Sequence, residues 1–341
     1  MKRIYNYIKY KLNKCFKLIK NIIINSCYYF HEMINLCFDK SRNICYTNFW
    51  PDFYNSPFKY YFINTINNKN DNFRIVKHYN PHIHFFSVFG NKKNIIKSKA
   101  KYKIFFTGEN VNDKKYISYR GNCINDVDLS LGFDYCNADN YLRFPLWLLY
   151  YFNPENTKDN IKQILNNFKI PYQKSKFCSL ISRQDNNGIR TKIYKEISKI
   201  ANVDCPGRLL YNDDSLQNIF NDNKSLYLRQ YKFNICPENS ISKGYVTEKI
   251  FECLNSGCIP IYNGWSNNPE PDIINPDIIL WYDEKDEQNN QNILKEIKLL
   301  NENDKFYSSF VSRPFFCDTA VEKIYNMLNQ YNTKLQNLLN L

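Results

Sequence analysis

The sequence predicts an α/β protein built from two Rossmann-like units, and three observations support this fold class. From residue 44 onward, short apolar segments of strand length alternate with segments whose apolar residues recur at helical spacing. A polar stretch at residues 153–174 separates two such series, as expected of a linker with one short helix. The chain has 341 residues, too many for one typical core and enough for two. Its hydrophobic content of 43% excludes wholesale disorder.

The N-terminal segment, residues 1–43, is basic and only patchily apolar. Its most apolar stretch, residues 22–24, is interrupted on both sides by Lys20, Asn21 and Asn25. It falls far short of the ~20 apolar residues that cross a membrane, and no signal peptide is visible. We expect a solvated stem, with a basic amphipathic helix in peripheral contact with a membrane as the alternative.

The first unit is predicted to span residues 44–165 and to contain strands and helices in alternation. A proline in the first turn and apolar residues at helical spacing predict a helix that starts at Ser56 and Pro57 and extends to Ile66. Period and composition predict short strands, which we place at residues 44–49, 74–78, 83–86, 104–106 and 127–131.

The second unit, residues 166–315, repeats the pattern. Strands are predicted at residues 177–182, 231–236 and 258–262, and a helix follows the first of them, with apolar residues from Ile189 to Ile200 on one face. Thr247 is expected to cap a second helix, which ends at Gly257. Pro260 fits the last strand poorly, because proline cannot donate a hydrogen bond to a neighbouring strand. Residues 316–341 predict a helical tail that packs on the first domain or mediates association.

The net charge of +13 has two interpretations, an anionic partner or a coding sequence rich in A and T, which favours Asn, Lys, Ile and Tyr. No basic cluster accompanies a nucleic-acid-binding motif, so we predict no nucleic-acid partner and keep such a module as an alternative only. Neither G-x-G-x-x-G nor G-x-x-x-x-G-K-[ST] occurs. Dinucleotide oxidoreductases and P-loop enzymes therefore lose their main support.

The twelve cysteines contain no C-x-x-C block of the kind that binds zinc. Cys253 and Cys258 come closest, but they lie where a predicted helix passes into a strand. We interpret them as small buried hydrophobic residues.

Two further groups resemble metal sites only superficially. Asp126 and Asp128 form a D-x-D pattern, but the residue between them belongs to a strand-like run, which favours a structural segment over a metal ligand. His78, His82 and His84 have no nearby cysteine or carboxylate partner, so we expect structural or acceptor-side roles. We therefore predict no metal site and no cofactor.

The most informative segment spans residues 231–264. A strand leads to a polar loop with Glu238 and Asn239, and the loop leads to a helix that carries Glu248 and Lys249 in its first turn. A helix N-terminus suits phosphate, a lysine adds full charge, and a glutamate can accept hydrogen bonds from ribose hydroxyls. An ordinary capped helix with exposed charges is the alternative.

This segment resembles the signature of glycosyltransferase family 10, the α1,3/α1,4-fucosyltransferases, in E-N-S at 238–240, Y-V-T-E-K at 245–249 and I-P-I at 259–261. T-G-E-N at 107–110 resembles the first-domain motif of the family, and the segments L-G-F-D at 131–134 and Y-L-R-F-P at 141–145 follow it as in bacterial members. Ile189 and Arg190 provide a third match. The resemblance covers roughly residues 44–315.

The resemblance implies a GT-B fold, in which an acceptor-side domain and a donor-binding domain face a cleft. Carried over by position, Arg190 and Lys249 are expected to neutralise the pyrophosphate of GDP-fucose. Tyr245 and Glu248 are expected to shape the ribose and phosphate pocket, and Asn239 to contact the donor.

Glu109 is the expected general base. Inversion requires the acceptor hydroxyl to attack from the face opposite GDP, so its proton must pass to a group on the acceptor side. A strand-end carboxylate beside Gly108 that only caps a turn is the alternative. The predicted function is inverting, metal-independent transfer of L-fucose from GDP-fucose to an oligosaccharide or glycoconjugate, α1,3 to an N-acetylglucosamine-type residue, in protein or lipid glycosylation. The alternatives are another nucleotide sugar and a catalytically dead glycan-binding protein.

Two departures from the family and one further feature of the sequence bear on the compartment. The cysteine pair near the C-terminus of vertebrate members is missing, with Cys317 alone, and the usual type II membrane anchor is absent. The single glycosylation sequon, at residues 223–225, also disfavours a secretory lumen. We expect a soluble or peripheral membrane protein, with a Golgi-type lumen as the alternative.

Overall fold

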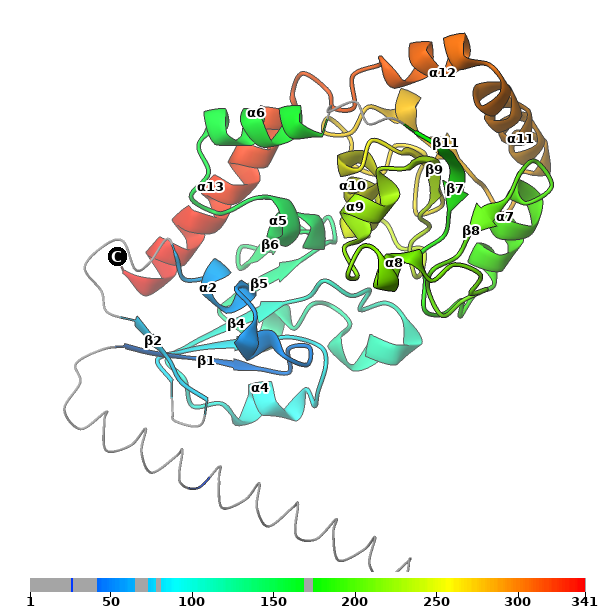
Figure 1. The fold of residues 1–341 in the computed structure, drawn as a ribbon. Helices are drawn as coiled ribbons and strands as arrows, with labels where there is room; N and C mark the ends of the chain where they lie inside the picture. Colours follow the sequence, from blue (N-terminus) through cyan, green and yellow to red (C-terminus); the bar gives the residue numbers. More distant parts are fainter. Residues whose placement is uncertain (1–25, 27–41, 65–72, 78–80, 169–173, 341) are drawn as a thin grey trace, which may run out of the picture. The chain divides into compact units, whose positions relative to one another are not determined.

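A computed structural model describes residues 26, 42–64, 73–77, 81–168 and 174–340 (Figure 1). The predictions for residues 1–41, for His78 and for the end of the helix expected from Ser56 to Ile66 lie outside these residues. Within them, no helix combines the length and the apolar character needed to cross a bilayer.

The chain forms two compact units, each of which is described by itself. The first comprises the described parts of residues 1–106, 123–130 and 335–341, and the second comprises those of residues 107–122 and 131–334. Both are discontinuous in sequence. The linear domain boundaries predicted after residues 43, 165 and 315 remain a prediction.

The first sheet has the strand order β2-β1-β3-β4-β5-β6. β1 pairs in parallel with β2 and β3, and β3 pairs in parallel with β4. β1 to β4 belong to the first unit, β6 belongs to the second, and the division passes through β5. The strands are β1 (Arg42–Thr47), β2 (Phe73–Ile75), β3 (Ile83–Phe86), β4 (Tyr102–Phe106), β5 (Leu129–Gly132) and β6 (Tyr141–Arg143).

Short helices accompany the strands of the first unit. The helix predicted from Ser56 begins at Phe58, with Pro57 at its N-cap. The core beside it is aromatic, because Phe62 packs on Phe85 at 5.4 Å and on Phe106 at 5.2 Å between ring centroids. These elements are η1 (Phe53–Asn55), α2 (Phe58–Tyr61), α4 (Lys93–Lys97) and η3 (Ile124–Asp126).

The aspartates and histidines singled out in the sequence have structural partners in this unit. Asp126 forms an ion pair with Lys92 at 2.9 Å, and Asp128 accepts a hydrogen bond from the backbone N–H of Lys103 at 2.7 Å. The two ring nitrogens of His84 lie 2.7 Å from the Thr47 hydroxyl and 2.9 Å from that of Ser98. Burial, assisted by the charge of Lys103, lowers the pKa of His84 to about 4, so this ring is neutral at physiological pH.

The second sheet has the strand order β11-β10-β9-β7-β8, and each of its neighbouring pairs is parallel. Figure 1 shows α9 and α10 on one side of this sheet and α7 and α11 on the other, the arrangement of a doubly wound α/β unit. The strands are β7 (Lys176–Ser179), β8 (Val203–Asp204), β9 (Tyr231–Ile235), β10 (Ile259–Tyr262) and β11 (Leu280–Trp281). The helices of the second unit are η2 (Lys114–Tyr119), α5 (Leu146–Tyr151), α6 (Lys158–Asn167), α7 (Ile189–Ile197), α8 (Ser215–Asn218), α9 (Lys224–Leu228), α10 (Glu248–Asn255), η4 (Pro276–Ile278), α11 (Glu287–Glu302), α12 (Asp304–Val311) and α13 (Ala320–Leu339), whose residues 335–339 are assigned to the first unit.

Pro260 is compatible with β10 because its backbone nitrogen faces β11 at a level where β11 is not yet paired. The carbonyl of Ile261 accepts from Cys236 on the β9 side, so the alternate residues Pro260 and Tyr262 face β11. Pairing with β11 starts only at the level of Ile261 and Leu280. The proline therefore precedes the paired part of the edge, and no ladder hydrogen bond is lost.

The tail helix α13 packs on the segment that was predicted as a linker. That segment contains α6, which begins at a capping box formed by Thr157 and Asn160. In α13, Tyr331 is completely buried and lies 5.1 Å from Phe144 between ring centroids. The Asn332 amide donates to the backbone carbonyl of Pro154 at 2.7 Å. Figure 1 shows α6 crossing the upper part of α13, and Lys158 of α6 forms an ion pair with Glu322 of α13.

Candidate functional site

The N-terminus of α10 is held by a buried carboxylate. β9 leads to a loop in which only 1% of the Glu238 surface is exposed. Its carboxylate accepts hydrogen bonds from the backbone N–H of Thr247 at 2.8 Å and from the Thr247 hydroxyl at 2.7 Å. Thr247 occupies the N-cap as predicted, but its hydroxyl donates to Glu238 and accepts from Nζ of Lys249 at 2.8 Å, not from a backbone N–H of the helix. Glu238 therefore performs the capping.

Lys249, in the first turn of α10, lies between two carboxylates. Its Nζ is 3.2 Å from Oε2 of Glu238 and 3.8 Å from Oε1 of Glu248. Burial lowers the pKa of Lys249, but the attraction of the two carboxylates outweighs burial and raises the pKa above its ordinary value. The ammonium is therefore charged at neutral pH and fixed at a helix N-terminus, where anions are favoured.

The N-terminus of α7 supplies Arg190. The helix begins after Gly188, whose φ of 78° favours glycine, and Asp185 accepts the backbone N–H groups of Arg190 and of the next residue. The Arg190 side chain is buried, and its Nη2 donates to Oδ1 of Asn239 at 2.9 Å and to the carbonyl of Pro237 at 3.2 Å. Burial lowers the pKa of Arg190. This guanidinium joins α7 to the loop that follows β9.

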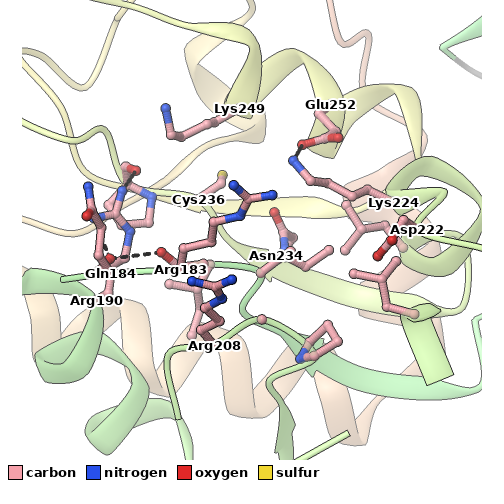
Figure 2. A pocket seen from close by; sticks show the side chains of 18 of the residues that line it. Arg183, Gln184, Arg190, Arg208, Asp222, Lys224, Asn234, Cys236, Lys249 and Glu252 are labelled. Carbon is pink, nitrogen blue, oxygen red and sulfur yellow. Dashed lines mark hydrogen bonds and ion pairs between the residues drawn. The ribbon is translucent and has the colours of Figure 1, made fainter. Parts of the chain in front are cut away.

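Both helix N-termini contribute to one pocket of about 1070 Å³ (Figure 2). Five of its lining side chains are cationic and three are carboxylates, so its walls carry excess positive charge. A pocket of this size and charge suits a nucleotide-sized anion. The charged lining residues are Arg183, Arg190, Arg208, Asp222, Lys224, Glu248, Lys249 and Glu252.

The structure brings four of the five predicted donor residues to the wall of this pocket: Arg190, Asn239, Glu248 and Lys249. Tyr245 is not among the lining residues. It is 2% exposed and packs against Phe133 at 5.0 Å between ring centroids, which supports the loop before α10 from behind. The roles of these five residues toward a donor remain predictions.

Glu109 lies in the loop after β4, and two amide side chains tie this loop to the one before α10. The Asn110 amide donates to the Ser240 hydroxyl at 2.8 Å, and the Asn112 amide donates to the Ser242 hydroxyl at 3.1 Å. The motif T-G-E-N at 107–110 and the motif E-N-S at 238–240, 130 residues apart, therefore meet within one compact unit. Glu109 is outside the lining of the pocket itself.

The carboxyl group of Glu109 is half-buried. Burial raises the pKa of Glu109 above its ordinary value, while the charges of Lys249 and Lys115 oppose the rise. A partly desolvated carboxylate in the field of a helix-terminal lysine has the properties of a general base.

Several lining residues of the pocket are absent from the sequence-based prediction. Lys224 and Glu252 form an ion pair at 3.5 Å. Glu252 follows Glu248 by four residues, and this spacing, which places both on one helix face, could have identified it. Arg183 lies in the loop that follows β7. Arg208 lies in an irregular segment after β8, and no sequence pattern marks it as a pocket residue.

A second buried ion pair supports the loop before α10. Arg143 donates two hydrogen bonds to the Glu270 carboxylate, at 3.0 and 2.9 Å, and one to the backbone carbonyl of Gly244 at 3.1 Å. Glu270, 1% exposed, also accepts from the Trp147 indole at 2.6 Å. Trp147 in turn stacks on Phe251 of α10 at 4.5 Å between ring centroids. This cluster connects the backbone at Gly244 to the buried face of the helix.

The part of the chain that the structure describes offers no cluster of metal ligands. No three histidine, cysteine, aspartate or glutamate side chains gather there in a manner that could hold an ion. Cys253 and Cys258 are buried, at 0% and 1% exposure, which agrees with their interpretation as small hydrophobic residues.

Two family models match the chain. Residues 44–150 match the alpha-(1,3)-fucosyltransferase FucT N-terminal domain, and residues 170–332 match the C-terminal model of glycosyltransferase family 10 (fucosyltransferase). Together they cover about four fifths of the sequence.

Curated relatives and solved structures agree with these matches. The alpha-(1,3)-fucosyltransferase FucT of Helicobacter pylori is 28% identical over 260 residues, which are 65% of this chain and 50% of that protein. The human 4-galactosyl-N-acetylglucosaminide 3-alpha-L-fucosyltransferase 9 is 26% identical over 143 residues, 42% of this chain and 38% of that protein. The chain thus spans half or less of the length of these two relatives.

A crystal structure of an alpha1,3-fucosyltransferase has a TM-score of 0.60 at 24% identity, with 86% of this chain and 90% of that chain covered. The same kind of enzyme with GDP has a TM-score of 0.58 at 25% identity and the same coverage. With two sheets of parallel pairing, these likenesses confirm the predicted α/β fold of GT-B type.

Proposed function

The chain belongs to glycosyltransferase family 10, the fucosyltransferase family, and from this premise we propose that it transfers L-fucose from GDP-fucose to a glycan hydroxyl with inversion. The acceptor we propose is an N-acetylglucosamine-type residue, fucosylated at O3. The names of the Helicobacter and human relatives, both 3-fucosyltransferases, support this linkage.

The observation that carries the proposal is the connection between the Glu109 loop and the loop before α10. Asn110 and Ser240, joined at 2.8 Å, set a half-buried carboxylate beside the cationic N-terminus of α10. A base and a diphosphate site held together in one unit are the two parts that an inverting transfer requires.

In the proposed reaction, the acceptor oxygen bonds to C1 of fucose as the bond between C1 and the β-phosphate oxygen breaks. The acceptor proton passes to the carboxylate of Glu109, which later releases it to water. The electron pair of the broken bond leaves with GDP, so negative charge grows on the diphosphate. Arg190 and Lys249, at the N-termini of α7 and α10, are placed to stabilise this charge.

We propose that these two cations stabilise the leaving group without a divalent metal. Arg190 is buried and hydrogen-bonded to the Asn239 loop, and Lys249 is fixed between Glu238 and Glu248. Preorganised charge of this kind needs no rearrangement when the bond breaks.

The test is GDP release by the purified protein with GDP-fucose and N-acetyllactosamine, with and without EDTA. We expect release that depends on acceptor and resists EDTA. Glu109→Gln should lower kcat by about 100-fold or more, because the amide cannot take the proton. Glu296→Gln, an exposed carboxylate of α11, is the matched control and should leave kcat unchanged.

The alternatives predict other results. A donor panel with GDP-mannose and UDP-N-acetylglucosamine identifies a transferase that uses another nucleotide sugar. Binding of GDP-fucose without turnover on a broad glycan array would indicate a glycan-binding protein with an inactive site. The absence of both binding and release would refute the fucosyltransferase assignment.

A further inference from the structure

Two arginines in the middle of the pocket have no partner of their own. Arg183 follows β7 and Arg208 follows β8, and both side chains line the pocket. Figure 2 shows them between Arg190 and Gln184 at one end of the pocket and Asp222 at the other. Within the described part of the chain, neither guanidinium forms a hydrogen bond or an ion pair with another residue.

The backbone holds these two arginines close together. Leu209 donates its backbone N–H to the carbonyl of Ser182 at 3.0 Å, which ties the segment after β8 to the end of β7. At Gly207, an added Cβ would lie 2.1 Å from the same carbonyl oxygen, so only glycine permits this approach. Arg183 and Arg208 are the next residues along the two segments, and both are exposed to solvent within the pocket, where a ligand can reach them.

Each of the other cations of the pocket has a partner within the protein. Lys224 is paired with Glu252, Lys249 is paired with Glu238 and Glu248, and Arg190 is bonded to the loop after β9. On the proposed function, Arg190 and Lys249 take the diphosphate. The volume of about 1070 Å³ leaves room for a nucleoside beside it.

Among the nucleobases, guanine presents the edge that best matches a guanidinium group. Its O6 and N7 are adjacent acceptors, and arginine meets them with two parallel N–H donors. Adenine replaces O6 with an amino group, which would face a guanidinium donor to donor. Uracil has no N7 at all. An arginine pair therefore distinguishes GDP from ADP and UDP.

We propose that Arg183 and Arg208 form the base-recognition site of the donor pocket and bind O6 and N7 of guanine. This inference rests on the proposed function and extends it. It assigns the preference for guanine to two residues that are separate from those proposed to bind the diphosphate.

The experiment measures the binding of GDP, ADP, IDP and 7-deaza-GDP to the full chain by calorimetry. We expect GDP and IDP, which share O6 and N7, to bind alike, and ADP and 7-deaza-GDP to bind about 10-fold to 100-fold more weakly. Arg183→Met and Arg208→Met should weaken GDP and IDP by about that factor and leave ADP unchanged. Arg120→Met, an exposed arginine, is the control and should change nothing.

Conservative variants separate base recognition from charge. Arg183→Lys and Arg208→Lys keep the positive charge and lose the paired donors, so they should lose GDP affinity nearly as the methionine variants do. Thermal melts verify that each variant is folded.

Two outcomes would overturn the inference while the proposed function stands. One is an equal loss of GDP and ADP binding in the methionine variants with rescue by lysine, which would make the arginines phosphate ligands. The other is GDP binding by the variants at wild-type affinity. If the wild-type chain binds no GDP at all, the proposed function itself fails.

Discussion

The Nζ of Lys249 lies 3.2 Å from the Oε2 of Glu238, a carboxylate with only 1% of its surface exposed. Glu238 also accepts both the backbone N–H and the hydroxyl of Thr247. One buried side chain thus fixes the start of α10 and the cation that this helix presents. The geometry of the diphosphate site depends on Glu238, although Glu238 does not line the pocket.

Replacement of Glu238 by glutamine should therefore impair stability and donor binding together. The amide oxygen can still accept a hydrogen bond from the backbone N–H of Thr247, but the negative charge that holds Lys249 is lost. We expect a loss of roughly 2 kcal/mol in the free energy of unfolding, typical of a hydrogen bond to a charged group, measured by urea denaturation. The KM for GDP-fucose should rise as well. A variant with wild-type stability and KM would show that Lys249 does not depend on Glu238.

The raised pKa of Glu109 predicts the acid limb of the pH profile. A general base must be deprotonated, so activity falls as the pH drops through its pKa. Because burial raises this pKa, kcat/KM should begin to decline at a higher pH than an ordinary glutamate would give. Lys115→Met removes a charge that opposes the rise, and the limb should move to still higher pH. An unchanged limb in this variant would argue against Glu109 as the titrating group.

The ion pair of Arg143 and Glu270 should be sensitive to removal of one partner. Glu270→Gln leaves a largely buried guanidinium without its counter-charge, and we expect a loss of about 3–5 kcal/mol in the free energy of unfolding. The double variant with Arg143→Met should lose less than the sum of the two single variants. Glu322→Gln, which breaks an exposed pair with Lys158, is the control and should leave the free energy of unfolding nearly unchanged.

The bond between Asn110 and Ser240 should matter for turnover more than for binding. Asn110→Ala frees the Glu109 loop from the loop before α10, so kcat should fall by about 10-fold, or about 1.4 kcal/mol of barrier. The affinity for GDP should stay within twofold, because Asn110 does not line the pocket. Asn112→Ala removes the exposed bond to Ser242 and is the matched control. Equal effects in both variants would mean that the contact at Asn110 has no special role.

The strands that were predicted most closely have an apolar residue at least at every second position. β3 matches its predicted range to the residue, and β9 and β10 differ from theirs by one residue each. β3 and β10 are nearly continuous apolar runs, as expected of strands covered on both faces, whereas β9 alternates apolar and polar residues. β8 and β11, with two residues each, are too short to show any period.

Two helices, α5 and α6, were difficult to predict because neither has a clear apolar stripe in its sequence. α6 was read only as a short helix within a linker, because Asn and Lys cover its outer face and few apolar residues mark the inner one. α5 was missed because most of its residues are apolar, so no stripe distinguishes a helix from a buried strand. Packing against other elements determines both of them.

In the candidate site, residue types were predictable and long-range contacts were not. Arg190 and Lys249 stand at helix N-termini that local signals reveal. The partnership of Arg143 with Glu270 joins residues 127 apart, and no local pattern encodes it. The position of Tyr245, behind the loop and away from the pocket wall, likewise depends on a distant residue, Phe133.

The docking of α13 on the segment at residues 139–158 sets an order for biosynthesis. Lys334 donates to the carbonyl of Asp139, and Asn332 donates to that of Pro154, 178 residues earlier in the chain. At translation rates of 5–20 residues per second, the earlier segment waits roughly 10 to 40 s for its partner to leave the ribosome. Phe144 stays uncovered by Tyr331 during that interval. The nascent chain thus completes the packing around Phe144 only after synthesis of α13.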